Sequence, residues 1–221
     1  MMAQSASRSP RTQEERTEAA KSRIKEAALE LFGRQGFEVV TLAAISLRAG
    51  YSRALAQYHY PDKTSLALEL LSERMARDNH ADLLSSDGVK SADEAWARLR
   101  AHFAAVKAYY GALHGQTRQS AALRGEMALT HAATMTDDPA IRDLVNKTTS
   151  DLVGKIRRLF EICAAHGALA KEADPHALAV VHVNSIWGLA LALFANPKGA
   201  KRIAAAFDQH WRLIEGVRTR R

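Results

Sequence analysis

The sequence predicts an all-α protein, and two features carry that prediction. Apolar residues recur at the i, i+3, i+4 spacing of one helix face, and no segment alternates in the way a strand does. Prolines stand where helices would begin, three of them after Asp or Asn: Asp138-Pro139, Asp174-Pro175 and Asn196-Pro197. We therefore expect helices separated by short polar connections.

The predicted helices span residues 18–35, 42–49, 53–60, 63–84, 92–114, 117–135, 139–166, 175–195 and 198–217. Gly36 is placed to end the first of them in the left-handed conformation. Residues 1–17 are polar and basic, and we expect a disordered tail there. An alternative is a basic arm that becomes ordered along the minor groove of DNA.

The composition is that of an ordinary globular protein of 221 residues, with 47% hydrophobic and 25% charged residues. The net charge of +7 favours polyanionic partners. The single cysteine, Cys163, excludes an intramolecular disulfide framework. The N-terminus lacks the apolar segment of a secretory signal, and polar residues interrupt the most apolar run, residues 177–194. We expect a cytoplasmic protein that does not span a membrane.

Residues 41–63, TLAAISLRAGYSRALAQYHYPDK, form the segment around which the chain is organised. Thr41 is placed to cap a first short helix and Ser52 a second. Gly50 supplies the positive φ that a tight turn between them needs. The second helix combines small and polar residues, which suits a helix that enters the DNA major groove, about 12 Å wide. The segment therefore predicts a helix-turn-helix.

Over roughly residues 21–71, this segment and the preceding AALELFGRQGFEVV resemble the DNA-binding domain of the tetracycline-repressor (TetR) family. The resemblance implies an all-α homodimer with an N-terminal three-helix helix-turn-helix domain, expected at residues 18–62. A larger helical domain for ligand binding and dimerisation is expected at residues 63–221. The implied function is that of a repressor that binds a palindromic double-stranded DNA operator and is released by a small, largely apolar inducer.

On this hypothesis, the base edges are contacted by Arg53, Leu55 and Gln57. The expected phosphate contacts come from hydroxyl, imidazole and ammonium groups, those of Thr41, Ser52, Tyr58, His59 and Lys63. For His59, packing against the first helix is the alternative.

The helix at residues 92–114 carries an aromatic stripe, which is typical of a core. In the family that the chain resembles, this helix also walls the inducer cavity. The predicted ligand-binding residues are Phe103, Tyr110, Met127, His131 and Trp187.

The last two helices carry more apolar surface than a hairpin can bury alone, which predicts an intermolecular four-helix bundle. The predicted dimer interface consists of Val181, Ile186, Leu189, Phe207 and Trp211. The polar side chains expected to hydrogen-bond in that bundle are His182, Asn184 and His210.

No sequence motif of a nucleotide-binding loop, a zinc protease or a hydrolase occurs, so we expect neither enzyme activity nor a cofactor. No two histidines lie three or four residues apart, and Cys163 with His166 is more typical of a buried thiol beside a helix end, so we expect no metal site. Two alternatives to a regulator remain open. One is a helical small-molecule-binding protein or enzyme without sequence-specific DNA binding, and the other is a structural protein without a cavity.

Overall fold

The computed structural model describes residues 12–78, 81–112 and 118–219. The helices in this part of the chain are α1 (Gln13–Gln35), α2 (Leu42–Ala49), α3 (Arg53–His59), α4 (Lys63–Asp78), α5 (Ala81–Leu84), α6 (Ala92–Gly111), α7 (Arg118–Met135), α8 (Pro139–Ala165), α9 (Pro175–Ala195), the 3₁₀ turn η2 (Pro197–Gly199) and α10 (Ala200–Gly216). The described residues contain no strand, only an isolated bridge between Leu169 and Arg218. The predicted all-α class is confirmed.

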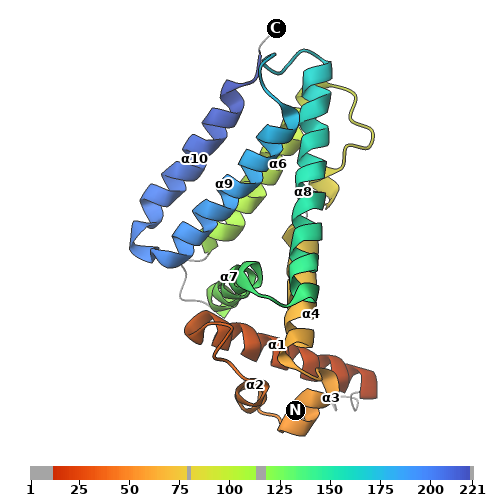
Figure 1. Cartoon of the computed structure of the whole chain (residues 1–221), viewed down its shortest axis with the longest axis vertical. Helices are drawn as coiled ribbons and strands as arrows, with labels where there is room; N and C mark the ends of the chain where they lie inside the picture. Colours follow the sequence, from red (N-terminus) through yellow and green to blue (C-terminus); the bar gives the residue numbers. More distant parts are fainter. Residues whose placement is uncertain (1–11, 79–80, 113–117, 220–221) are drawn as a thin grey trace, which may run out of the picture.

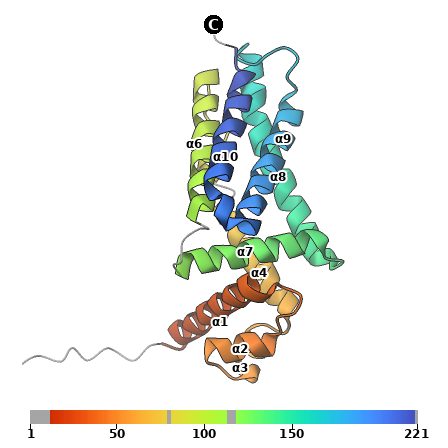
Figure 2. The ribbon, with the colours of Figure 1, turned by 90° about the vertical axis from the view of Figure 1, so that its left-hand side faces the viewer.

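The helices form an elongated molecule (Figure 1). Helices α1, α2 and α3 lie together at one end, and α4 leads away from them. Helices α6, α8, α9 and α10 form a bundle at the other end, with the C-terminus at its far tip. Helix α7 crosses between the two parts, roughly perpendicular to the long axis (Figure 2).

Aspartate caps and prolines begin α8 and α9 where the sequence predicts. The carboxylates of Asp138 and Asp174 each accept hydrogen bonds from two backbone N–H groups of the first turn. Pro139 and Pro175 follow them at the start of the helix, where the missing N–H costs nothing. Helix α9 has its predicted bounds.

The predicted start of the first helix is wrong. Helix α1 begins at Gln13, five residues before the expected 18, so residues 13–17 of the predicted disordered tail are helical. The cause is a capping box, in which Thr12 and Glu15 exchange side-chain and backbone hydrogen bonds. The remaining tail, residues 1–11, lies outside the described residues.

Three other predicted helices differ from the structure by more than one residue at an end. The helix expected at residues 63–84 is divided into α4 and α5, with residues 79–80 outside the described part. Helix α6 ends at Gly111, and residues 113–114 of its predicted span are likewise not described. Helix α10 begins only at Ala200, because Pro197–Gly199 first forms a 3₁₀ turn that the Asn196 side chain caps.

Buried apolar side chains form two clusters. The N-terminal cluster packs α1–α3 against α4, α7 and the start of α8; among its members are Ile24, Phe32, Ile45, Ala56, Tyr60, Leu66, Leu71, Leu129 and Ile141. The C-terminal cluster fills the bundle, with Trp96, Leu99, Phe103, Phe160, Phe207 and Trp211 among its members. Because Leu66 and Leu71 come from α4, the N-terminal cluster continues past residue 62, where the sequence places the domain boundary.

Helices α1 and α7 are in backbone contact where they cross. A Cβ atom on Gly125 would lie 1.9 Å from the carbonyl oxygen of Leu29. A Cβ atom on Gly33 would lie 2.9 Å from the backbone nitrogen of Gly125. Glycine is therefore required at the crossing, because any side chain at Gly125 would occupy the space of the α1 backbone.

Replacing Gly125 by Ala is expected to lower the free energy of unfolding by about 3 kcal/mol or more, because α1 and α7 must separate. The measurement is chemical denaturation followed by circular dichroism. Gly154→Ala in α8 is the matched control, since a Cβ there meets nothing within 4 Å. The helix propensity of Ala should leave that variant as stable as the parent or up to about 1 kcal/mol more stable. Equal stabilities for the two variants would contradict a tight crossing.

Candidate nucleic-acid interface and internal cavity

Caps and a glycine turn hold α2 and α3 together as a helix-turn-helix. Thr41 Oγ1 accepts from the backbone N–H of Ala44 at 3.2 Å. Ser52 Oγ accepts from the backbone N–H of Leu55 at 3.2 Å. Gly50 ends α2 in the left-handed conformation, at a φ of 77°. The caps and the turn are as predicted, and each hydroxyl keeps its own proton for a further acceptor.

Helix α3 buries one face and exposes the other. Ala56 and the C-cap Tyr60 are 0% and 1% exposed, whereas Tyr58 is 80% exposed. Arg53 and Gln57, one helical turn apart, are also exposed. Neither side chain forms an ion pair or hydrogen bond with another described residue. The free face thus carries donors and acceptors that suit the edges of base pairs.

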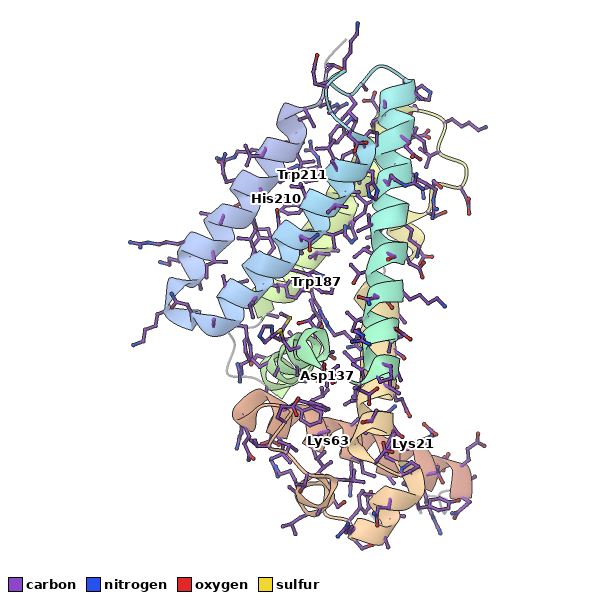
Figure 3. All side chains as sticks on the ribbon, viewed as in Figure 1. Lys21, Lys63, Asp137, Trp187, His210 and Trp211 are labelled. Atoms are coloured by element: carbon purple, nitrogen blue, oxygen red, sulfur yellow. The ribbon has the colours of Figure 1, made fainter. Side chains whose placement is uncertain are left out.

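Lys63 is engaged within the protein. Its Nζ donates to the carbonyl oxygens of Phe37 at 2.9 Å and Glu38 at 3.1 Å, and lies 4.2 Å from the centroid of the Phe37 ring. Figure 3 labels Lys63 in the N-terminal part of the molecule, below α7. The ammonium group ties the start of α4 to the loop that follows α1. One of its three N–H groups remains for a phosphate.

Two exposed apolar residues in this domain were not predicted as site residues. Val39 is 68% exposed and Leu47 is 81% exposed. The spacing could have found Leu47, because a residue two positions after the buried Ile45 points away from the core. By contrast, the predicted Leu55 and His59 are half-buried, and the His59 ring packs edge-on against Tyr58 at 5.2 Å.

Lys25 fixes α1 against α4. Its Nζ lies 2.5 Å from a carboxylate oxygen of Glu69 and of Glu73, and the hydroxyl of Tyr60 donates to Glu69 at 3.2 Å. Partial burial lowers the pKa of Lys25, but hydrogen bonds to the two carboxylates outweigh it, so the net shift is upward. The charge is therefore used to orient the helices.

A cavity of about 30 Å³ lies within the bundle, next to α7. It is lined by His102, Val106, Tyr109, Tyr110, Leu152, Val183, Ile186 and Trp187. Tyr110 and Trp187 are predicted ligand-binding residues, and Figure 3 labels Trp187 on the side of α9 nearer α7. Phe103 stacks on Trp211 in the core at 5.0 Å, and His131 is exposed, so neither lines this cavity. The cavity holds about one water molecule as it stands.

A buried arginine on α4 reaches the wall of this cavity. Arg74 is 3% exposed, and its Nη2 donates to the hydroxyl of Tyr110 at 3.1 Å. Its Nη1 donates to Thr130 Oγ1, and its Nη2 lies 3.9 Å from the sulfur of Met127. Met127, a predicted ligand residue, thus lies behind the lining, and α4, α6 and α7 meet at one guanidinium group.

A second set of polar groups lies beside the first. The carboxylate of Glu126 on α7 accepts from the Tyr109 hydroxyl and from the guanidinium of Arg77 on α4. Both tyrosines of the lining are therefore bonded to charged groups that join α4 to α7. A molecule that displaced either ring would disturb these contacts.

Three histidines from three helices meet near the cavity, an arrangement that their sequence spacing did not predict. His182 Nδ1 and His210 Nε2 are 2.9 Å apart, and the two rings stack at 5.1 Å. The His102 ring lies 6.3 Å from that of His182. Burial, then the proximity of His210 and His102, lowers the pKa of His182 to about 3. Burial also lowers the pKa of His210.

The predicted dimer residues differ in exposure. Phe207, Trp211 and Ile186 are buried in the core of their own bundle, and Leu189 is half-buried. Val181 on α9 is 53% exposed, and Leu213 on α10, which was not predicted, is 65% exposed. Asn184 is exposed and its side chain donates to the Val180 carbonyl, whereas His182 and His210 bond each other, so all three hydrogen-bond within one chain.

Among the described residues, no group of three or more His, Cys, Asp or Glu side chains is placed to hold a metal ion. Cys163 is buried, which raises its thiol pKa to about 12, while His166 is exposed.

Helix α9 is long and apolar enough to cross a membrane. It packs between α8 and α10 with His182 fully buried, as a core helix does.

Residues 24–70 match the sequence model of the family described as bacterial regulatory proteins, tetR family. No curated protein matches the chain. Solved structures match over most of its length, although at low sequence identity.

The complex of SmeT, a repressor from Stenotrophomonas maltophilia, with triclosan is 19% identical, with a TM-score of 0.69 over 88% of this chain and 91% of that one. NalD, the secondary repressor of the MexAB-OprM multidrug efflux pump in Pseudomonas aeruginosa, is 19% identical, with a TM-score of 0.64 over 89% and 97%. A transcriptional regulator from Saccharomonospora viridis in complex with choline is 20% identical, with a TM-score of 0.66 over 92% and 100%. At these identities the likeness shows the fold.

The depressed pKa of His182 makes stability depend on pH. The group titrates at about 3 when folded and near 6.5 when unfolded, so its stabilisation is present above about pH 6.5 and is lost as the pH falls toward 3. Between about pH 6 and pH 5, the free energy of unfolding therefore falls by nearly 1.4 kcal/mol per pH unit. Urea denaturation at several pH values should show that the free energy of unfolding depends less steeply on pH in His182→Leu than in the parent. His176→Leu, at an exposed histidine of the same helix, should keep the pH dependence of the parent. The same pH dependence in all three proteins would contradict a neutral buried His182.

Proposed function

We propose that this chain is a ligand-responsive transcriptional repressor of the TetR family of bacterial regulatory proteins, whose sequence model its residues 24–70 match. It acts in the cytoplasm as a homodimer on a palindromic operator. A small, largely apolar inducer releases it. The family is one of regulators, which agrees with a protein that is not an enzyme.

The exposed face of α3 is the observation that carries this proposal. Arg53, Gln57 and the accessible part of Leu55 contact base edges in the major groove. The phosphates are contacted by Thr41, Ser52, Tyr58, His59 and the remaining N–H of Lys63. The exposed Leu47 offers apolar contact to a thymine methyl group.

A dimer supplies the second recognition helix. Val181 and Leu213 leave apolar surface exposed on α9 and α10, and a second copy of this pair would cover it. Two-fold symmetry then places two copies of α3 in successive major grooves, about 34–36 Å apart.

The inducer acts from the internal cavity. Two of the similar structures hold small organic molecules, triclosan in one and choline in the other, which supports a ligand for this chain too. Displacement of Tyr110 by a ligand moves Arg74 on α4, and displacement of Tyr109 moves Glu126 on α7, which is bonded to Arg77 on α4. Helix α4 begins against the helix-turn-helix. The ligand shifts operator affinity only by its differential affinity for the two arrangements.

Selection of DNA from a random pool by the purified full chain, followed by sequencing, tests the proposal. Enrichment of an inverted repeat is the expected result. Weak, strongly salt-dependent binding without enrichment, by a folded protein, would overturn it. That outcome would favour a helical ligand-binding protein or enzyme on the same scaffold.

On the selected operator, Gln57→Ala should change the preferred base at one position without altering the salt dependence. Lys63→Gln should weaken binding to all sequences and lower the salt slope by about 1. Quantitative binding at several salt concentrations measures both. Because Lys63 also bonds to the Phe37 and Glu38 carbonyls, the melting temperature of Lys63→Gln must be followed as well. A lower melting temperature with an unchanged salt slope would make Lys63 a structural tie only.

A further inference from the structure

The cavity lining narrows the chemical class of the ligand. Tyr109, Tyr110 and Trp187 supply three aromatic rings, and such rings hold either organic cations or flat uncharged molecules. The rings alone do not decide between these classes. The polar and charged groups around them do.

The charges near the cavity disfavour a cation. None of the lining residues is an acid. The carboxylate of Glu126 already accepts from Arg77 and Tyr109, and the buried guanidinium of Arg74 stands behind the Tyr110 hydroxyl. A cation–π contact strengthens binding by roughly tenfold, whereas burying an unpaired charge weakens it by at least about a hundredfold. The cost of burying the charge therefore outweighs the cation–π contact, and a cation is disfavoured.

The histidines offer a polar anchor beside the cavity, although His182 itself is not part of the lining. His102 lines the cavity, and its ring lies 6.3 Å from that of His182. His182 is fully buried, and among the described residues its Nε2 has no hydrogen-bond partner. A buried polar nitrogen without a partner is unfavourable, so a hydroxyl group that reached this cluster would stabilise the complex. The low pKa of His182 keeps its imidazole neutral.

We propose that this cavity binds phenols, which are uncharged molecules with a hydroxyl group on an aromatic ring, and excludes organic cations. The inference rests on the proposed function, because it names the inducer class for the same cavity. The ring lies among Tyr109, Tyr110 and Trp187, and the hydroxyl points to His102 and His182. A volume of about 30 Å³ requires the lining to move on binding. Of the lining side chains, Tyr109, Leu152 and Trp187 are only half-buried, so their outward movement disturbs the core least.

Three probes of similar size test the ligand class by calorimetric titration of the full chain without DNA. They are 4-ethylphenol, 4-ethyltoluene, which has methyl in place of hydroxyl, and phenyltrimethylammonium. The expected result is that 4-ethylphenol binds about tenfold more tightly than 4-ethyltoluene and that the cation does not bind. Equal affinity of the first two, preference for the cation, or no binding of any probe would overturn the proposal.

Separate measurement of operator release distinguishes this inference from the proposed function. Binding of 4-ethylphenol without any change in operator affinity would leave the ligand class standing and overturn the regulatory role. Binding of the cation with operator release would overturn the ligand class and leave the regulatory role standing.

Variants locate the site. Leu152→Ala enlarges the cavity and should tighten binding of 4-ethylphenol several-fold. His182→Phe should abolish the advantage of 4-ethylphenol over 4-ethyltoluene, while His166→Phe, at an exposed histidine, should retain it. If His182→Phe does not fold, the imidazole ¹⁵N resonances of the parent serve instead. A shift of the His182 signal with 4-ethylphenol and none with 4-ethyltoluene is expected, and the absence of that difference would contradict the placement of the hydroxyl.

Discussion

The contact of the α1 and α7 backbones at Gly125 is the constraint on which the rest of this structure depends. With the Leu29 carbonyl in the place that a side chain would take, the two helices have no compressible layer between them. Movement of α7 must therefore be followed by α1 or break the packing. Helix α1 is in turn tied to α4 by Lys25, so the helix-turn-helix is joined to the bundle through two helices.

The polar groups inside the bundle meet at the same joint. Arg74, which is buried, and Arg77, which is exposed, project from α4 and bond to groups on α6 and α7. An unpaired charge at Arg74 would be costly. The cavity lies against the two tyrosines that complete these contacts. A ligand there acts on groups that have few alternative partners, which is the physical basis on which we infer that binding changes the position of α4. His102 adds a polar group to the cavity lining, beside the neutral imidazole of His182.

The local parts of this arrangement were predictable, because each depends on residues close in sequence. The caps at Thr41 and Ser52, the left-handed turn at Gly50 and the helix starts at Pro139 and Pro175 are as expected. The capping box at Thr12 obeys the same rule and was missed, although its pattern is visible in the sequence. Of the residues predicted from the aromatic stripe and the family resemblance, Tyr110 and Trp187 line the cavity, whereas the lining residues Tyr109 and His102 were not predicted. Such a stripe identifies a buried face without saying which neighbour that face meets.

The sequence by itself determined that the chain is helical, where most helices begin, and that residues 41–63 form a helix-turn-helix, because backbone caps and apolar spacing are local properties. Only the tertiary structure decided which distant residues meet. The three histidines are 28 or more positions apart, Lys63 bonds carbonyls in a preceding loop, and Gly125 faces a helix nearly a hundred residues earlier in the chain. Such contacts depend on how the faces of helices pair, and that pairing is set by packing of the whole core.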